Sequence, residues 1–222
     1  MNNSSKSNLI FHKFIFNVFD QNTYVVYDQS SKEAWVFDPG NSNEIENDEI
    51  ERFILENELN LTKILNTHGH IDHVFGVNFL KEIFNPQFLF PSPDLPLIKN
   101  INLQAEIVGL PAPKIPNVDL DIHEFEKLKL GNETVKILRT PGHSPGGTCY
   151  YFVNSKKIIT GDTLFFEAIG RTDLWGGNEI ELMKSIEENI LKLDDEIEIL
   201  PGHGPASTIY HEKINNPFLQ NF

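Results

Sequence analysis

The heptapeptide Thr67–His73, THGHIDH, concentrates side chains that bind metal ions. Its histidines and its aspartate follow the pattern HxHxDH. Residues two apart on an extended segment point the same way, so His68 and His70 can reach one metal ion. Asp72 and His73 fall where the chain is expected to turn into a helix, and there they can face a second ion. Imidazole and carboxylate ligands without thiolate suit Zn, Fe or Mn.

Three further turns have a similar composition, and each follows an expected strand. TPGHSPGG contains His143, GDTLF contains Asp162, and PGHGP contains His203. Rigid strands that end in tight turns hold a ligand set with little spread. The resulting set is too large for one tetrahedral ion and suits two ions that share a carboxylate. Metals roughly 3.5–4 Å apart can hold a bridging hydroxide as nucleophile and polarise the attacked group.

The elements expected around these turns alternate between strands and helices. Apolar and β-branched runs predict strands at Asn8–Phe16, Thr23–Tyr27, Glu33–Phe37, Lys63–Leu65, Thr134–Leu138, Thr148–Val153, Lys156–Thr160 and Ile197–Leu200. Apolar residues at helical spacing predict helices at Glu44–Asn60, Val74–Phe84 and Glu179–Leu193. This alternation predicts a layered α/β fold.

The segment Pro91–His123 separates the two halves and is rich in proline. Proline interrupts helices and central strands, so irregular structure or a few short turns are expected here. Two interpretations remain open. The segment is either a rigid connector or, over Pro91–Pro116, a loop or lid that faces the substrate.

Composition restricts the possible partners of the chain. It has 222 residues, 40% of them apolar, and a formal net charge of −14. Such an acidic protein is expected to be soluble and to repel nucleic acid and anionic membranes. One cysteine, Cys149, excludes an intrachain disulfide. Without a signal-peptide pattern or a long apolar run, we expect a cytoplasmic protein.

The four motifs, in this order and at these separations, resemble those of the metallo-β-lactamase fold superfamily, from Tyr24 almost to the C-terminus. The resemblance implies a four-layer αββα sandwich with the metal site at one edge, between the two sheets. Within the superfamily, GDTLF, IGRTDL and PGHGP resemble the glyoxalase II group. The stretch Asn216–Gln220, NPFLQ, is similar to the short bacterial type. Residues 1–222 are therefore expected to form one domain, without the C-terminal helical domain that binds glutathione.

The resemblance also implies the ligand assignment. The first metal would be held by His68, His70 and His143, the second by Asp72, His73 and His203, with Asp162 bridging the two. Asp72 and Asp162 are the residues expected to act in catalysis. The implied cofactors are two divalent ions, with Zn favoured over Fe or Mn. The implied reaction is hydrolysis of a thioester such as S-lactoylglutathione by a metal-held hydroxide, in a protein expected to be a monomer.

Substrate contacts are expected at Phe165 and Phe166, which lie close to Asp162 in the chain, and in Pro91–Pro116. Arg171 has two interpretations. It could meet an anionic substrate, or it could order its loop through an ion pair with Asp173, and we favour the ion pair.

Several other activities use the same fold. Sulfur dioxygenases that oxidise glutathione persulfide with one iron share HxHxDH and the GRTD segment, but their last motif tends to read PAHD where this chain has PGHG. Phosphodiesterases and RNA nucleases share HxHxDH, and the net charge of −14 argues against them. A lactonase or β-lactamase remains an alternative. Metal content and O₂ consumption separate the hydrolase from the dioxygenase.

Overall fold

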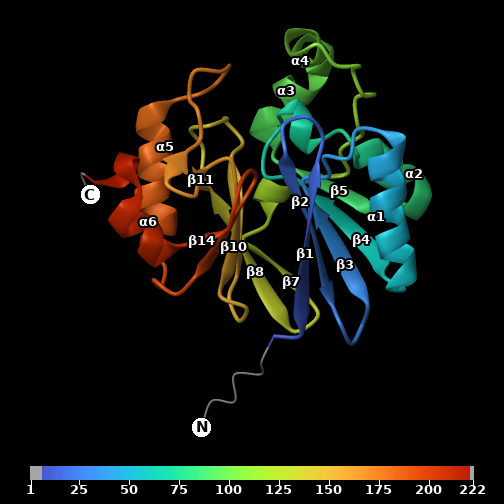
Figure 1. The fold of residues 1–222 in the computed structure, drawn as a ribbon, viewed down its shortest axis with the longest axis horizontal. Helices are drawn as coiled ribbons and strands as arrows, with labels where there is room; N and C mark the ends of the chain where they lie inside the picture. Colours follow the sequence, from blue (N-terminus) through green and yellow to red (C-terminus); the bar gives the residue numbers. More distant parts are fainter. Residues whose placement is uncertain (1–6, 221–222) are drawn as a thin grey trace.

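Two β-sheets pack face to face, and helices cover their outer faces (Figure 1). This arrangement is seen in a computed structural model, which describes residues 7–220. The first half of the chain builds one sheet with its helices, and the second half builds the other. The predicted four-layer αββα sandwich is confirmed.

The first sheet has six strands that lie in chain order. They are β1 (Leu9–Phe16), β2 (Gln21–Asp28), β3 (Glu33–Phe37), β4 (Asn60–Leu65), β5 (Gln87–Phe90) and β6 (Leu120–Asp121). Pairing is antiparallel from β1 to β3 and parallel from β3 to β6. Parallel neighbours need crossover connections, which here contain α1 (Glu44–Glu56) and α2 (Val77–Phe84).

The second sheet also has six strands. Their order is β14 (Ser207–Thr208), β13 (Glu198–Pro201), β10 (Lys157–Gly161), β9 (Thr148–Phe152), β8 (Glu133–Arg139) and β7 (Lys127–Leu130). Only the β10–β13 pair is parallel among these described strands. The outer face carries α5 (Glu179–Ser185) and α6 (Ile209–Asn215), and β11 (Leu164–Phe165) pairs separately with β12 (Ala168–Ile169).

The apolar core between the sheets explains why the layers stay together. Strand β2 is buried along its whole length, because alternate side chains serve different layers. Val26 packs between the sheets with Phe37 and Tyr150, whereas Val25 packs against the helices of the first half. Full burial of such side chains stabilises the fold by about 1.5–3 kcal/mol each.

The helix expected at 74–84 starts later in the structure. A 3₁₀ turn at Ile71–His73 comes first, and α2 begins at Val77. The backbone before α2 is bound elsewhere: the His73 carbonyl accepts from Asn66 Nδ2 (2.7 Å), and Gly76 N donates to Pro39 O (2.8 Å). A helix that began at Val74 would need the His73 carbonyl for Val77 N, which instead donates to Val74 O (3.2 Å).

Two other helix boundaries also differ from the prediction. Helix α1 ends at Glu56 because Glu58 has a left-handed backbone (φ 55°) and Leu59 N donates back to Ile54 O (3.0 Å). Asn60 N then donates to Lys32 O (2.8 Å) at the start of β4. The expected helix 179–193 divides into α5 and a π-helical turn at Ile186–Ile190.

The proline-rich segment is more regular than predicted. It forms a 3₁₀ turn at Ser92–Asp94, then α3 (Leu95–Lys99) and α4 (Ile101–Val108). Pro93 and Pro96 lie in the first turns of their elements, where the missing N–H would have no helical partner in any case. The prediction of irregular structure or a few short turns was therefore wrong for α3 and α4, whereas residues 110–119 contain no helix or strand. Figure 1 shows α3 and α4 at one end of the sandwich.

The helices of the described residues are too short to cross a membrane. The longest helix among residues 7–220 is α1 with 13 residues, and no helix in that range is long and apolar enough to span a bilayer.

Candidate metal centre

The four ligand-bearing turns meet at one edge of the sandwich. They follow β4, β8, β10 and β13, and hydrogen bonds between the sheets hold this edge together. Tyr150 donates its hydroxyl to Asn66 O (2.6 Å), and Tyr24 donates to Pro201 O (2.8 Å). Asn22 N adds a bond to Gly202 O (2.7 Å). The turns after β4 and β13 are therefore fixed by side chains of the opposite sheet.

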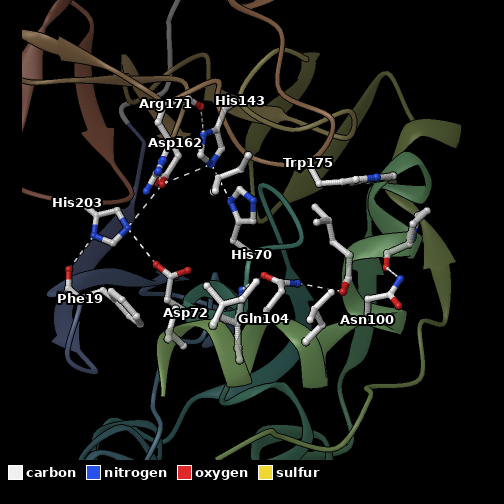
Figure 2. A pocket seen from close by; sticks show the side chains of 17 residues that line it. Phe19, His70, Asp72, Asn100, Gln104, His143, Asp162, Arg171, Trp175 and His203 are labelled. Carbon is white, nitrogen blue, oxygen red and sulfur yellow. Dashed lines mark hydrogen bonds and ion pairs between the residues drawn. The ribbon is translucent and has the colours of Figure 1, made fainter. Parts of the chain in front are cut away.

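All seven residues predicted as metal ligands come together there. Three overlapping groups each have ligand atoms within 4.8 Å of one another: His68, His70 and His143; His68, His73 and Asp162; and Asp72, His73 and His203. In Figure 2, Asp162 lies between His143 and His203. One Asp162 oxygen is 3.6 Å from His143 Nε2 and 3.7 Å from His203 Nε2, which is the position of a shared ligand.

Backbone carbonyls orient two of the imidazoles. His143 Nδ1 donates to Arg171 O (2.8 Å), and His203 Nδ1 donates to Phe19 O (3.0 Å). In the neutral rings the lone pair is then on Nε2, which faces the cluster in both residues. Such outer hydrogen bonds fix the tautomer of metal-binding histidines.

A hydroxyl orients His68 in the same way. Thr67 donates its only hydroxyl proton to Asp38 Oδ2 (2.7 Å). The Thr67 hydroxyl oxygen therefore accepts from His68 Nδ1 (2.9 Å). The Nε2 lone pair of His68 again faces inward. Asp38 also accepts from Thr67 N (2.7 Å).

The residues fit a divalent metal ion. His68 Nε2 and Asp162 Oδ1 are buried and have no hydrogen-bond partner among the described residues. Each such orphan costs about 1–3 kcal/mol unless something binds it. Glycine leaves space beside them, because a Cβ at Gly202 would collide with Asp162 Oδ1 and come within 2.8 Å of His73 Cε1. The donor set and the space both suit a cation.

The pKa values of these ligands are shifted by burial and by their charged neighbours. Burial lowers the pKa of His68 and lowers that of His70 to about 3, so both rings are neutral and able to bind at neutral pH. Burial opposes the charge of His73, but Asp72 and Asp162 outweigh it and raise its pKa. Burial also opposes the charge of Asp162, but His73 outweighs it and holds the pKa well below the usual range. Without a metal, a proton on His73 partly offsets these carboxylates.

Asp94 is a residue of this site that the sequence analysis missed. Its buried carboxylate accepts from Gly69 N (2.9 Å) in the first ligand turn, and from Gly146 N (2.6 Å) and Ser144 Oγ (2.7 Å) in the second. It therefore ties the two turns to each other. Nothing in the local sequence SPDLP indicates this role, whereas Asp38 carried a signal because it follows a strand end, as Asp162 does.

A pocket of about 720 Å³ opens beside the ligands. Its walls include His70, Asp72, His143, Asp162 and His203, together with Phe19, Ile71, Pro96, Leu97, Asn100, Leu103, Gln104, Ile107, Val108, Arg171, Leu174 and Trp175. Seven of these side chains come from 91–116, so this segment faces the pocket, as one of the two interpretations expected.

The predicted substrate contacts have different positions. Phe165 and Phe166 do not line the pocket: the Phe165 ring lies 6.2 Å from that of His203, and Phe166 stacks on His211 at 4.8 Å. Arg171 does line it, but its guanidinium binds both carboxylate oxygens of Asp173 (2.7 and 2.8 Å). The geometry of the favoured ion pair is therefore present.

Removal of the metal should lower thermal stability. A metal at about 1,000 times its Kd stabilises a folded protein by about 4 kcal/mol, which corresponds to roughly 10 °C for a domain of this size. We expect a chelator to lower Tm by about this amount and re-addition of divalent metal to restore it, as measured by calorimetry. An unchanged Tm after verified metal removal would contradict a metal centre in this cluster.

Comparisons with known proteins agree with this geometry. Residues 16–203 match the family described as the metallo-beta-lactamase superfamily. A hydroxyacylglutathione hydrolase, GloC of Haemophilus influenzae, is 38% identical over 210 residues, which cover 91% of this chain and 94% of that protein.

Solved structures show the same fold. The BLEG-1 B3 metallo-beta-lactamase aligns with a TM-score of 0.87 and 31% identity, covering 95% of this chain and 100% of the other. TTHA1623, solved in a di-iron-bound form, aligns with a TM-score of 0.81 and 31% identity over 94% of this chain and 100% of the other. The chain therefore belongs to the metallo-beta-lactamase superfamily of metal-dependent hydrolases.

Proposed function

We propose that this protein hydrolyses a thioester, such as S-lactoylglutathione or a related hydroxyacyl thioester, with two divalent metal ions. The observation that carries the proposal is that the seven predicted ligands meet beside an open pocket, with one Asp162 oxygen 3.6 Å from His143 Nε2 and 3.7 Å from His203 Nε2. We assign them to two sets that share Asp162. The first set is His68, His70 and His143, and the second is Asp72, His73 and His203. We favour Zn as the metal in both, with Fe or Mn as alternatives.

When bound, the metals would acidify a water molecule and polarise the thioester carbonyl. Asp72 and Asp162 both line the pocket; Asp162 would help to orient the water, and Asp72 would take up its proton. The water oxygen adds to the acyl carbon, the C–S bond breaks, and the sulfur leaves with its electron pair. The released proton protonates the thiolate, so the products are a carboxylic acid and a thiol.

Two properties of the chain support a small-molecule substrate. The net charge of −14 disfavours nucleic acid and anionic membranes as partners. The pocket volume of about 720 Å³ lies in the range typical of sites for small molecules. We also propose that the protein acts as a cytoplasmic monomer.

Metal analysis coupled to a thioester assay tests the proposal. We expect about two divalent metals per chain, and thiol release from S-lactoylglutathione that stops after chelation and returns with added metal. A single iron, no thiol release and O₂ consumption with glutathione persulfide would instead assign the protein to the dioxygenases. Full thioesterase activity of the stripped protein would contradict the role of the metals.

A further inference from the structure

Helix α4 presents apolar side chains to the open pocket. Leu103 is 56% exposed and Ile107 is 76% exposed, and both line the cavity together with Val108. Helices on a protein surface normally turn such residues toward the core. Leu103 and Ile107 are large aliphatic side chains that stay exposed in one wall of the pocket, which suggests a binding surface.

The opposite wall has the same character. Leu174 and Trp175 line the pocket, and Trp175 is 59% exposed. Figure 2 shows Trp175 on the far side of the pocket from His203, with Gln104 and Asn100 below it. An apolar channel therefore leads from the metal ligands past α4 to the indole ring of Trp175.

The polar side chains in this channel are largely committed to the protein itself. Gln104 Oε1 accepts from Ile71 N (3.0 Å), and its amide nitrogen donates to Leu97 O (3.0 Å). Asn100 Nδ2 donates to Pro96 O (2.8 Å). Gln104 uses its second N–H on Gly69 O (3.3 Å), whereas Asn100 keeps one N–H and its Oδ1 for a ligand.

Cationic groups are scarce in the pocket as well. Within the described part of the chain, Arg171 is the only lysine or arginine among the lining residues, and both oxygens of Asp173 already bind it. Glutathione carries two carboxylates, which proteins usually bind through unpaired cations or clusters of donors. In place of such cations and donors, the channel offers apolar side chains.

We propose that the natural substrate is a thioester with an uncharged, apolar chain of roughly four to eight carbons, bound between α4 and Trp175. This inference rests on the proposed thioester hydrolysis, and within that reaction it takes an apolar thioester, rather than S-lactoylglutathione, as the natural substrate. The apolar chain could belong to the acyl group or to the thiol. The chemistry in the channel is the same for both, and the experiment below separates them.

The first measurement is a chain-length series with the metal-loaded protein. N-acetylcysteamine thioesters of C2, C4, C6 and C8 acids vary the acyl side, and S-alkyl thioacetates of the same lengths vary the thiol side. Each buried methylene should raise kcat/KM about threefold in the series whose chain enters the channel. A flat response in both series, or a faster reaction with S-lactoylglutathione than with every neutral substrate, would overturn the inference while leaving thioester hydrolysis intact.

A matched pair of variants locates the effect. Ile107→Ser should reduce the C8 to C2 ratio by about tenfold, because it removes an apolar wall of the channel. Ile180→Ser is the control, since Ile180 is 83% exposed on α5 and does not line the pocket. An equal reduction in both variants would contradict the channel as the source of the chain-length effect.

A binding series decides the question independently of activity. Calorimetric titration of metal-loaded protein with C2, C4, C6 and C8 alkyl hydroxamates should give a Kd that falls about threefold per methylene, and less steeply in Ile107→Ser. A Kd that does not change with chain length would overturn the inference. If no thioester is cleaved, the proposed function fails, and this series still determines whether the channel binds apolar chains.

Discussion

The variant Asp162→Ala is expected to lose metal and activity together. In the proposed assignment the two sets share Asp162, one oxygen of which lies 3.6 Å from His143 Nε2 and 3.7 Å from His203 Nε2, so its removal should weaken both metals at once. Even the loss of a residue that only orients a ligand costs about 10–100-fold in metal affinity or activity. We therefore expect metal content to fall from about two to at most one per chain, and kcat/KM to fall at least about 1,000-fold. Elemental analysis and the thioester assay measure the two quantities on one sample.

A control separates this effect from general damage. His211→Ala removes a histidine that pairs with Glu167 and belongs to none of the three ligand groups. It should keep both metals and full activity. Circular dichroism tests whether Asp162→Ala remains folded. Retention of two metals with normal turnover in Asp162→Ala would refute the assignment, and His70→Ala repeats the test at a ligand of the first set only.

The variant Asp94→Ala is expected to weaken the metal centre without removing a ligand. It deprives the Gly69 N–H, the Gly146 N–H and the Ser144 hydroxyl of their buried acceptor. Each unsatisfied donor costs about 1–3 kcal/mol, so Tm should fall by roughly 10 °C. The two ligand turns are no longer tied to each other, and metal affinity should fall about 10–100-fold. Chelator competition measures the affinity, and calorimetry measures the stability.

Asp119→Ala is the matched control for Asp94. Asp119 lies farther along the same connecting segment, is exposed, and pairs with Lys81. The variant loses this surface ion pair and the bond that Asp119 accepts from Phe88 N (2.8 Å), at a cost of about 1–2 kcal/mol, and should leave metal affinity unchanged. Asp94→Asn adds a sharper comparison, because its amide keeps one acceptor oxygen but places a donor against donors. If both Asp94 variants bound metal as tightly as the parent, the carboxylate would have no role in positioning the turns.

Much of the fold was predictable because most of its longer strands and helices have a recognisable pattern of apolar residues in the local sequence. Strands such as β3 and β9 are continuous apolar runs, and α1 repeats apolar residues at helical spacing, so each element carries its own signal. The strands missed were β5 and β7, with four residues each, and β6, β11, β12 and β14, with two residues each. Pairing with a neighbour, rather than local preference, makes these segments strands.

In the proline-rich segment, local sequence rules were not sufficient to predict helices α3 and α4. Proline excludes the interior of a helix but is tolerated in the first turn, and composition alone cannot say which position each proline occupies. The start of α3 depends on packing, because Leu97 and Ile98 are buried. The same packing aims Leu103 and Ile107 into the pocket, so the channel could not be predicted from the sequence.

The sequence by itself determined the residues of the candidate metal centre. Ligand chemistry is carried by residue type, and HxHxDH places two histidines on one side of an extended segment. Strand ends followed by glycine and proline then indicated where His143, Asp162 and His203 would lie. Their roles as ligands to two metals stay a prediction, and the structure adds that all seven side chains meet.

Only the tertiary structure decided what surrounds these ligands. Carbonyls of Phe19 and Arg171 orient His203 and His143, and Asp94 joins two ligand turns that lie far apart in the chain. Such contacts depend on how the two sheets pack, and no local periodicity encodes that packing. For the same reason the expected contacts at Phe165 and Phe166 gave way to a pocket wall built from α3, α4 and Trp175.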